Sequence, residues 1–162
     1  PIPLLPINSP ASFLKGFPVT NAQHILISLE PRHAENILSG RKRVELRKRA
    51  MNVDAGTTVW IYAKLPVGSV VGKATVSEVL STTPASVWRR FGKDTGVTKQ
   101  EFSAYYGESE QAVVLVLDET TRFEKAMSLA HLRKKAGAFY PPQFFTRLFP
   151  EHPIFKAMSC AA

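Results

Sequence analysis

The side chains best suited to chemistry gather in one short stretch of the chain, residues 40 to 47. Their pattern is Gly-x-Lys-x-x-Glu-x-Arg, formed by Gly40, Lys42, Glu45 and Arg47. Arg47 offers a planar set of donors suited to a phosphate or to the carbonyl edge of a base, and Lys42 could supply a point charge for phosphate. Glu45 could accept from an exocyclic amine or hold Arg47 in place. If a pocket removed water from Lys42, the pKa of its amine would fall and the amine could act as a base.

Much of the chain's positive charge lies around the same stretch. Residues 32 to 49 contain seven Lys or Arg and two Glu, which gives +5 out of a net charge of +8 for the 162 residues. Such a region favours polyanions, namely nucleic acid, nucleotides or an anionic membrane face. We interpret Arg41 and Arg43 as the basic rim of a cleft that holds Lys42, Glu45 and Arg47. The alternative is a solvated basic turn, on which a Glu45–Arg47 pair would contribute under ~1 kcal/mol.

Three elements are expected to position this stretch. Apolar residues at every second position predict a buried strand over 24–30. Pro31 suits the first turn of a helix, and Gly40 suits the residue after its end, where glycine adopts a left-handed backbone. Over residues 43–47 apolar and charged side chains alternate, which predicts a half-buried strand. Glu45 and Arg47 would then project from the same face of that strand.

The rest of the chain predicts a small α+β fold. Its strands are joined mostly by turns rather than by crossover helices, which favours a mixed β-barrel with short helices on its rim. A Pro-rich arm is expected over residues 1–23, one domain over 24–150 and a C-terminal tail over 151–162. Thr98 and Glu101 match a capping box at the start of a helix. Further strands are expected over 57–63, 69–81 and 111–117, and further helices over 83–91, 98–106 and 128–135.

Aromatic side chains could add stacking surfaces for bases, which contribute ~1–3 kcal/mol per base. Tyr62 and Trp88 are the candidates, because strand ends and loop helices can line the mouth of a barrel. Trp60 and Phe102 are assigned to the core instead.

Several classes of protein are disfavoured by composition. The single cysteine, Cys160, leaves no partner for a disulfide within the chain and no cysteine-based zinc site, and the four histidines have no ligand spacing, so no metal is expected. No glycine-rich phosphate loop is present, and no cofactor is expected. There is neither an apolar run of about 20 residues nor a signal-peptide pattern, so the sequence predicts a cytoplasmic protein that does not enter a membrane.

Beyond these patterns, the sequence resembles the ASCH domain family of the PUA-like superfamily over residues 24 to 148. The resemblance implies a PUA-like β-barrel with a cleft lined by the signature strand. It also implies RNA, a nucleotide or a modified nucleoside as the ligand. The variants most like this chain are described as predicted transcriptional regulators. The matching residues are 25–31, Ala34, Ile37, the signature from Gly40 to Arg47, Ile61-Tyr62-Ala63, Pro66, Val71-Gly72, Trp88, Gly96-Val97-Thr98, Phe102, Tyr105 and Pro141-Pro142-Gln143.

Two enzymatic activities are also implied by the resemblance. One related subgroup is similar to small amidohydrolases that deacylate N4-acetylcytidine with a Lys, a Thr three residues later and an acid from a later loop. Here Lys42 matches the Lys, Glu45 stands at the Thr position, and the acid position falls near Thr95, with Asp94 beside it. The nucleophile of that mechanism is therefore absent. Other ASCH proteins have been proposed to be ribonucleases, a reaction that Lys42 could serve.

The sequence thus supports two main hypotheses. The first is a binding module for RNA, other single-stranded nucleic acid or a modified nucleotide, in which Lys42 and Arg47 take a phosphate or a base carbonyl. The second is a hydrolase, either a ribonuclease or a nucleoside amidohydrolase, in which Lys42 acts as a base and Glu45 or Asp94 assists. A third hypothesis is regulation through a protein partner. No helix-turn-helix pattern is visible, so direct reading of a DNA sequence is unsupported.

Overall fold

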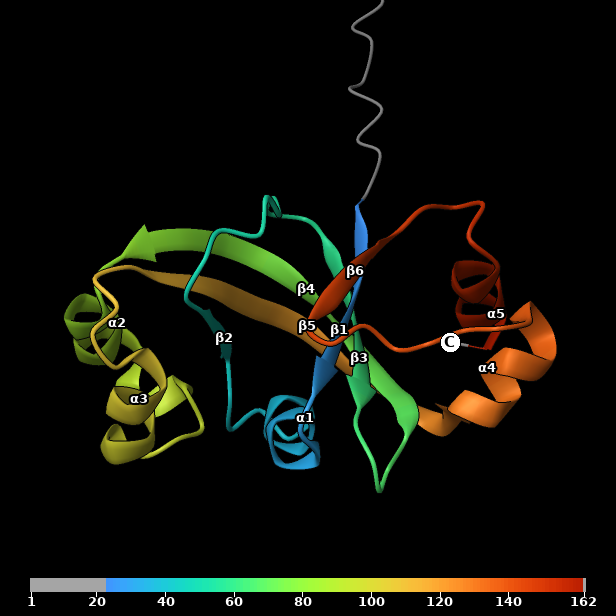
Figure 1. The fold of residues 1–162 in the computed structure, drawn as a ribbon, viewed down its shortest axis with the longest axis horizontal. Helices are drawn as coiled ribbons and strands as arrows, with labels where there is room; N and C mark the ends of the chain where they lie inside the picture. Colours follow the sequence, from blue (N-terminus) through green and yellow to red (C-terminus); the bar gives the residue numbers. More distant parts are fainter. Residues whose placement is uncertain (1–22, 162) are drawn as a thin grey trace, which may run out of the picture.

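The structure is a computed structural model that describes residues 23–161 (Figure 1). The arm predicted over 1–23 lies outside the described residues, apart from Gln23. The elements in chain order are β1 (His24–Leu29), α1 (Pro31–Leu38), β2 (Val44–Arg47), β3 (Thr58–Ala63), β4 (Ser69–Thr82), α2 (Pro84–Phe91), the 3-10 turn η1 (Gly92–Asp94), α3 (Lys99–Tyr106), β5 (Ala112–Ser128), α4 (Leu129–Ala136), β6 (Phe145–Leu148) and α5 (Pro153–Ala161).

The six strands form one mixed sheet in the order β2-β5-β4-β3-β1-β6. The pair β1 and β3 is parallel, and the other neighbours are antiparallel. The sheet curls into a half-barrel, with α2 and α3 at one end of the long β4–β5 hairpin and α4 and α5 at the other (Figure 1). Because strands and helices are not alternating crossover units, this is an α+β fold, as the sequence predicted.

The alternation of side chains along the strands gives the sheet an apolar cluster on each face. Ile25, Ile27 and Ile61 pack together with Ile37 of α1. Leu26 and Trp60 point the other way and pack with residues of α4 and α5. A third cluster joins Val44 and Leu46 of β2 to Phe102 and Tyr106 of α3. Trp60 and Phe102 are buried, which confirms their assignment to the core.

Three elements differ from the sequence-based expectations: the end of β5, the strand β6 and the helix α5. Strand β5 continues to Ser128 rather than ending at 117, because its polar second half pairs with the first half of β4 through shifts of register. One of these shifts lies between Val70 and Gly72. Within the segment expected as a tail, residues 153–161 form α5, whose Ile154 and Met158 are buried one turn apart against the sheet's second cluster.

The helices of the described region are short. The longest, α5, has 9 residues. Among residues 23–161, none of the helices has the length and apolar character that crossing a membrane would take.

Candidate functional site

The signature stretch forms a tight turn that is fastened on both sides. Gly40 follows the end of α1 with a φ of +79°, in the left-handed region that glycine tolerates. The Lys42 backbone N–H then donates to the carbonyl of Asn36 at 2.9 Å, and the Arg43 N–H donates to the carbonyl of Asp94 at 2.8 Å. The turn therefore connects the end of α1 to the end of η1 and sets where Lys42 points.

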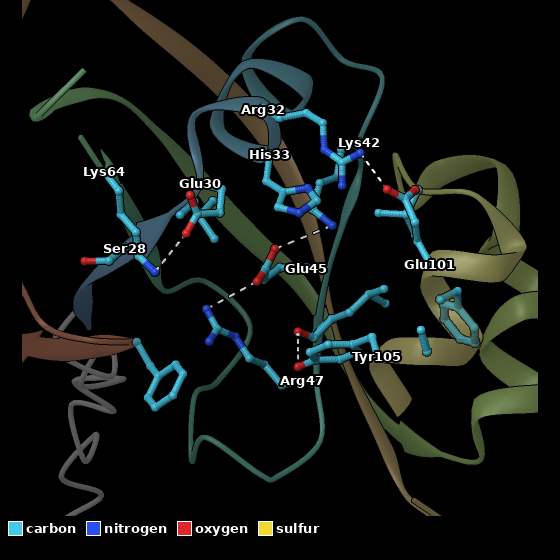
Figure 2. Close-up of a pocket in the computed structure, with 16 residues that line it drawn as sticks. Ser28, Glu30, Arg32, His33, Lys42, Glu45, Arg47, Lys64, Glu101 and Tyr105 are labelled. Carbon is cyan, nitrogen blue, oxygen red and sulfur yellow. Dashed lines mark hydrogen bonds and ion pairs between the residues drawn. The ribbon is translucent and has the colours of Figure 1, made fainter. Parts of the chain in front are cut away.

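Lys42, Glu45 and Arg47 form a buried chain of charges (Figure 2). Lys42 Nζ lies 3.6 Å from Glu45 Oε2, and Arg47 Nη2 lies 3.2 Å from Glu45 Oε1. The side chains of Lys42 and Glu45 are 4% and 8% exposed, and that of Arg47 is 14% exposed. The Lys42 ammonium also donates to the carbonyl of Thr95 at 2.9 Å. One carboxylate thus serves two cations in a site with little water.

Burial changes the protonation of this site. Loss of water lowers the pKa of Lys42, and the nearby Glu45 carboxylate opposes that shift without cancelling it. Burial and the neighbouring Lys42 ammonium also lower the pKa of His33, a residue of α1. The His33 Nδ1 atom is buried and has no hydrogen-bond partner among the described residues. The imidazole is therefore favoured in its neutral form beside the charged chain.

These groups face a cavity of about 490 Å³, which we call the signature cleft (Figure 2). It collects side chains from β1, α1, β2 and α3, together with residues that follow β1 and β3 and one that precedes β6. The cleft is lined by Ser28, Leu29, Glu30, Arg32, His33, Lys42, Glu45, Leu46, Arg47, Lys64, Val97, Glu101, Phe102, Ala104, Tyr105 and Phe144.

Arg47 keeps unused hydrogen-bonding capacity in the cleft. A guanidinium has five N–H donors. The Nε and Nη2 atoms of Arg47 are buried, and neither has a hydrogen-bond acceptor among the described residues, although Nη2 is ion-paired with Glu45. An acceptor-rich ligand would satisfy these donors.

Helix α3 closes one side of the cleft through its tyrosines. The Tyr105 hydroxyl donates to the carbonyl of Leu46, and the Tyr106 hydroxyl donates to the carbonyl of Arg47, both at 3.3 Å. Burial raises the pKa of both phenols, which stay protonated donors. The Tyr105 side chain remains 42% exposed and lines the cleft.

An ion pair spans two walls of the cleft. Arg32 Nη1 of α1 lies 2.7 Å from Glu101 Oε1 of α3. The backbone N–H of Thr98 and the Arg32 guanidinium both bond the Glu101 carboxylate and lower its pKa to about 2. Glu101 also completes the predicted capping box with Thr98. The Glu101 carboxylate therefore helps to cap the N-terminus of α3 and links α3 to α1.

Only some of the site residues predicted from the sequence lie in the signature cleft. It brings Lys42, Glu45 and Arg47 together, but Arg41 and Arg43 are exposed outside the cleft, with Arg43 Nη2 3.8 Å from Asp118 Oδ1. Asp94 meets the turn through its backbone carbonyl, and its side chain does not line the cleft.

The two aromatic candidates also lie elsewhere. Tyr62 is 4% exposed and packs in the cluster beneath α4 and α5, because it shares a face of β3 with Trp60. Trp88 packs on Phe102, with ring centroids 5.0 Å apart. Neither lines the signature cleft. The aromatic side chain that does, Tyr105, was among the residues that match the family but was not one of the two candidates for stacking. His33 carried no signal beyond its closeness to the signature.

Comparisons with known proteins show the family to which the chain belongs. A family model described as "Domain of unknown function (DUF365)" matches residues 24–140. An ASCH domain-containing ribonuclease from Zymomonas mobilis is 30% identical over 133 residues, which are 82% of this chain and 89% of that protein. The chain belongs to the ASCH domain family.

Superposition on solved structures shows which fold this ASCH domain has. The crystal structure of ASCH from Zymomonas mobilis superposes with a TM-score of 0.78 at 29% identity, covering 85% of this chain and 94% of that one. Human THYN1, crystallised with DNA containing 5-methylcytosine, superposes with a TM-score of 0.51 at 14% identity, covering 85% and 97%. The second likeness concerns the fold alone. The PUA-like fold implied by the signature residues is thereby confirmed.

Proposed function

We propose that this ASCH domain binds single-stranded RNA and holds one nucleotide of the strand in the signature cleft. The observation that carries the proposal is Arg47. Its guanidinium is ion-paired with Glu45 and lines a cavity of about 490 Å³, and its buried Nε and Nη2 atoms have no hydrogen-bond acceptor among the described residues. This volume lies in the range of sites that bind small molecules. A phosphate or the carbonyl edge of a base would fill the vacant donor positions.

The other groups of the cleft suit the rest of a nucleotide. Lys42 adds a second cation on the other side of Glu45 from Arg47. The Glu45 carboxylate could accept from an exocyclic amine. Tyr105 replaces Tyr62 and Trp88 as the candidate for stacking, because its half-exposed ring lines the cleft. A ribonuclease among the relatives supports RNA as the strand. A regulatory role and a cytoplasmic location, both expected from the sequence, stay predictions.

Binding of a fluorescently labelled single-stranded RNA tests the proposal. We expect Arg47→Ala to weaken binding by roughly 10- to 100-fold, since a hydrogen bond to a charged group contributes about 1.5–3 kcal/mol. It should also reduce the slope of log K against log salt by about 0.7, the share of one phosphate contact on a single strand. Circular dichroism and thermal unfolding check that the variant is folded.

Two further variants serve as controls. Arg49→Ala removes an exposed arginine two residues away that does not line the cleft, and it should leave the affinity within about twofold. Arg47→Lys keeps the positive charge but loses the planar, forked set of N–H donors. Its affinity for RNA should therefore lie between those of Arg47→Ala and the wild-type domain. Equal losses in Arg47→Ala and Arg49→Ala would reduce the site to a diffuse basic surface.

A second candidate function is RNA hydrolysis with Lys42 as the base. Its support is the burial that lowers the pKa of Lys42, which makes a neutral amine accessible, together with the relative named as a ribonuclease. Glu45 lies close enough to assist, at 3.6 Å. The binding samples also test this candidate, because a cleaving domain would shorten the RNA on a gel and Lys42→Ala would not. RNA that stays intact with the wild-type domain would leave binding alone as its function.

A further inference from the structure

A second cavity lies against the signature cleft. It has a volume of about 500 Å³, and we call it the side groove. Three residues, Ser28, Glu30 and Lys64, line both cavities. They come from the ends of β1 and β3, which are parallel neighbours paired from His24–Thr58 to Leu29–Ala63, so both strands end at the same place. The side groove is lined by Ser28, Glu30, Tyr62, Lys64, Leu65, Leu129, Pro141 and Pro142.

The wall between the two cavities carries one cation and one carboxylate. Lys64 Nζ lies 3.2 Å from Glu30 Oε1, and the side chains are 40% and 62% exposed (Figure 2). An exposed ion pair of this kind contributes little to stability. The Lys64 ammonium is therefore free to exchange its partner for a phosphate that crosses the wall. The Glu30 carboxylate would repel that phosphate. The charge of Glu30 should therefore weaken binding, which can be tested.

The side groove itself is mainly apolar. Pro141, Pro142 and Leu129 line it, and Leu65 at its edge is 78% exposed. Next to Pro141 along the chain, the Tyr140 side chain is 80% exposed, with the Arg133 guanidinium 5.3 Å from its ring centroid. Large exposed apolar side chains beside a groove mark a surface for a ligand. Flat apolar surfaces with nearby cations suit a base and its backbone.

Ser28 supplies an independent sign of a ligand at the junction. This residue is 6% exposed, and its Oγ atom is buried with no hydrogen-bond partner among the described residues. Its backbone N–H is used, donating to the carbonyl of Phe144 at 2.9 Å. A buried hydroxyl without a partner is uncommon in folded proteins. A ribose hydroxyl or a base edge at the wall would complete it.

We propose that the side groove is a second nucleotide subsite, so that the strand bound by this domain spans at least two nucleotides and its linking phosphate passes Lys64. The inference rests on the proposed function, because it extends the strand held at Arg47. It extends the part of the strand that the domain contacts from one nucleotide to at least two.

Calorimetric titration with uridine 5′-monophosphate and with the dinucleotide pUpU tests the second subsite. The wild-type domain should bind pUpU at least about tenfold more tightly than the monophosphate, within the range for stacking one more base. Leu65→Gln, at a residue that lines only the side groove, should remove most of this gain and leave the monophosphate affinity unchanged. Lys64→Gln, at a residue that lines both cavities, should lower the affinity for pUpU more than the affinity for the monophosphate. Glu30→Gln should increase the gain, because it removes the charge that faces the linking phosphate. Lys125→Gln, an exposed lysine on β5 that lines neither cavity, is the matched control.

The outcomes separate this inference from the proposed function. Equal affinity of the wild-type domain for pUpU and the monophosphate would overturn the second subsite and leave the signature cleft standing. So would a gain that persists in Lys64→Gln and Leu65→Gln. Absence of binding to both probes and to a longer RNA would overturn the proposed function itself.

Discussion

Glu45 allows two cations to share one buried site. Lys42 and Arg47 are both largely removed from water, and each lies within 4 Å of a Glu45 oxygen. Without that carboxylate the two charges would be buried without compensation, which is strongly unfavourable. Glu45 therefore has a structural reason to be acidic. It positions the groups that we propose to meet RNA.

The lowered pKa of Lys42 predicts how stability changes with pH. Burial makes the folded protein release this proton at a lower pH than the unfolded chain does. Below the folded pKa both states hold the proton, and the full cost of burying the charge is present. As pH rises through the folded pKa towards about 10.4, the unfolded value, the unfolded state holds more protons and folding becomes more favourable.

A comparison of the wild-type domain with the Lys42→Met variant isolates this effect. Urea unfolding from pH 7 to pH 10 should show the free energy of unfolding of the wild-type domain rising relative to that of Lys42→Met. The same comparison with Lys93→Met, an exposed lysine, should be nearly flat. A difference between wild type and Lys42→Met that does not change with pH would contradict the buried cation.

At the scale of elements, α3 is attached to the cleft by polar contacts at both of its ends. Its start is fixed by the capping box of Thr98 and Glu101, and its end by the Tyr105 and Tyr106 hydroxyls on β2. The carboxylate of Glu101 has a pKa lowered to about 2, so its contribution is present above about 4.5 and is lost as pH falls from there. The start of α3 should thus weaken in acid before the sheet does.

Substitution of the cap should couple stability to binding. Thr98→Ala removes the side chain that accepts from the Glu101 N–H and should cost about 1 kcal/mol of stability. Because α3 carries Tyr105 to the cleft, the variant should also bind RNA more weakly. Thr83→Ala removes the corresponding cap of α2, which lines neither cavity, and should lower stability without lowering affinity. If both variants bound RNA alike, α3 would have no special role in the cleft.

At the scale of the whole molecule, periodicity predicted the elements well and their distant contacts poorly. Alternation over 43–47 correctly put Glu45 and Arg47 on one face, and the β1–α1 boundary followed from Pro31. The polar half of β5 was missed because its pairing with β4 depends on shifted register rather than on an apolar pattern. Helix α5 was missed because it is short and carries, among its described residues, just two fully buried side chains, Ile154 and Met158.

For the site, too, periodicity predicted local features better than contacts between distant elements. Alternation shows that Trp60 and Tyr62 share a face of β3, but it does not show which face meets the cleft, and the helices α4 and α5 cover theirs. Lys64 and Tyr105 reach the cleft from elements distant in sequence from the signature. Their positions follow from the curl of the sheet and from the order of its strands, which local patterns do not specify.

A crystal structure of the domain with a single-stranded hexauridylate would test the central claim most directly. The account predicts a nucleotide in the signature cleft, with a phosphate or base oxygen within hydrogen-bond distance of the Arg47 guanidinium. RNA bound instead along the basic end of α4, at Arg133, Lys134 and Lys135, with the signature cleft empty, would contradict it.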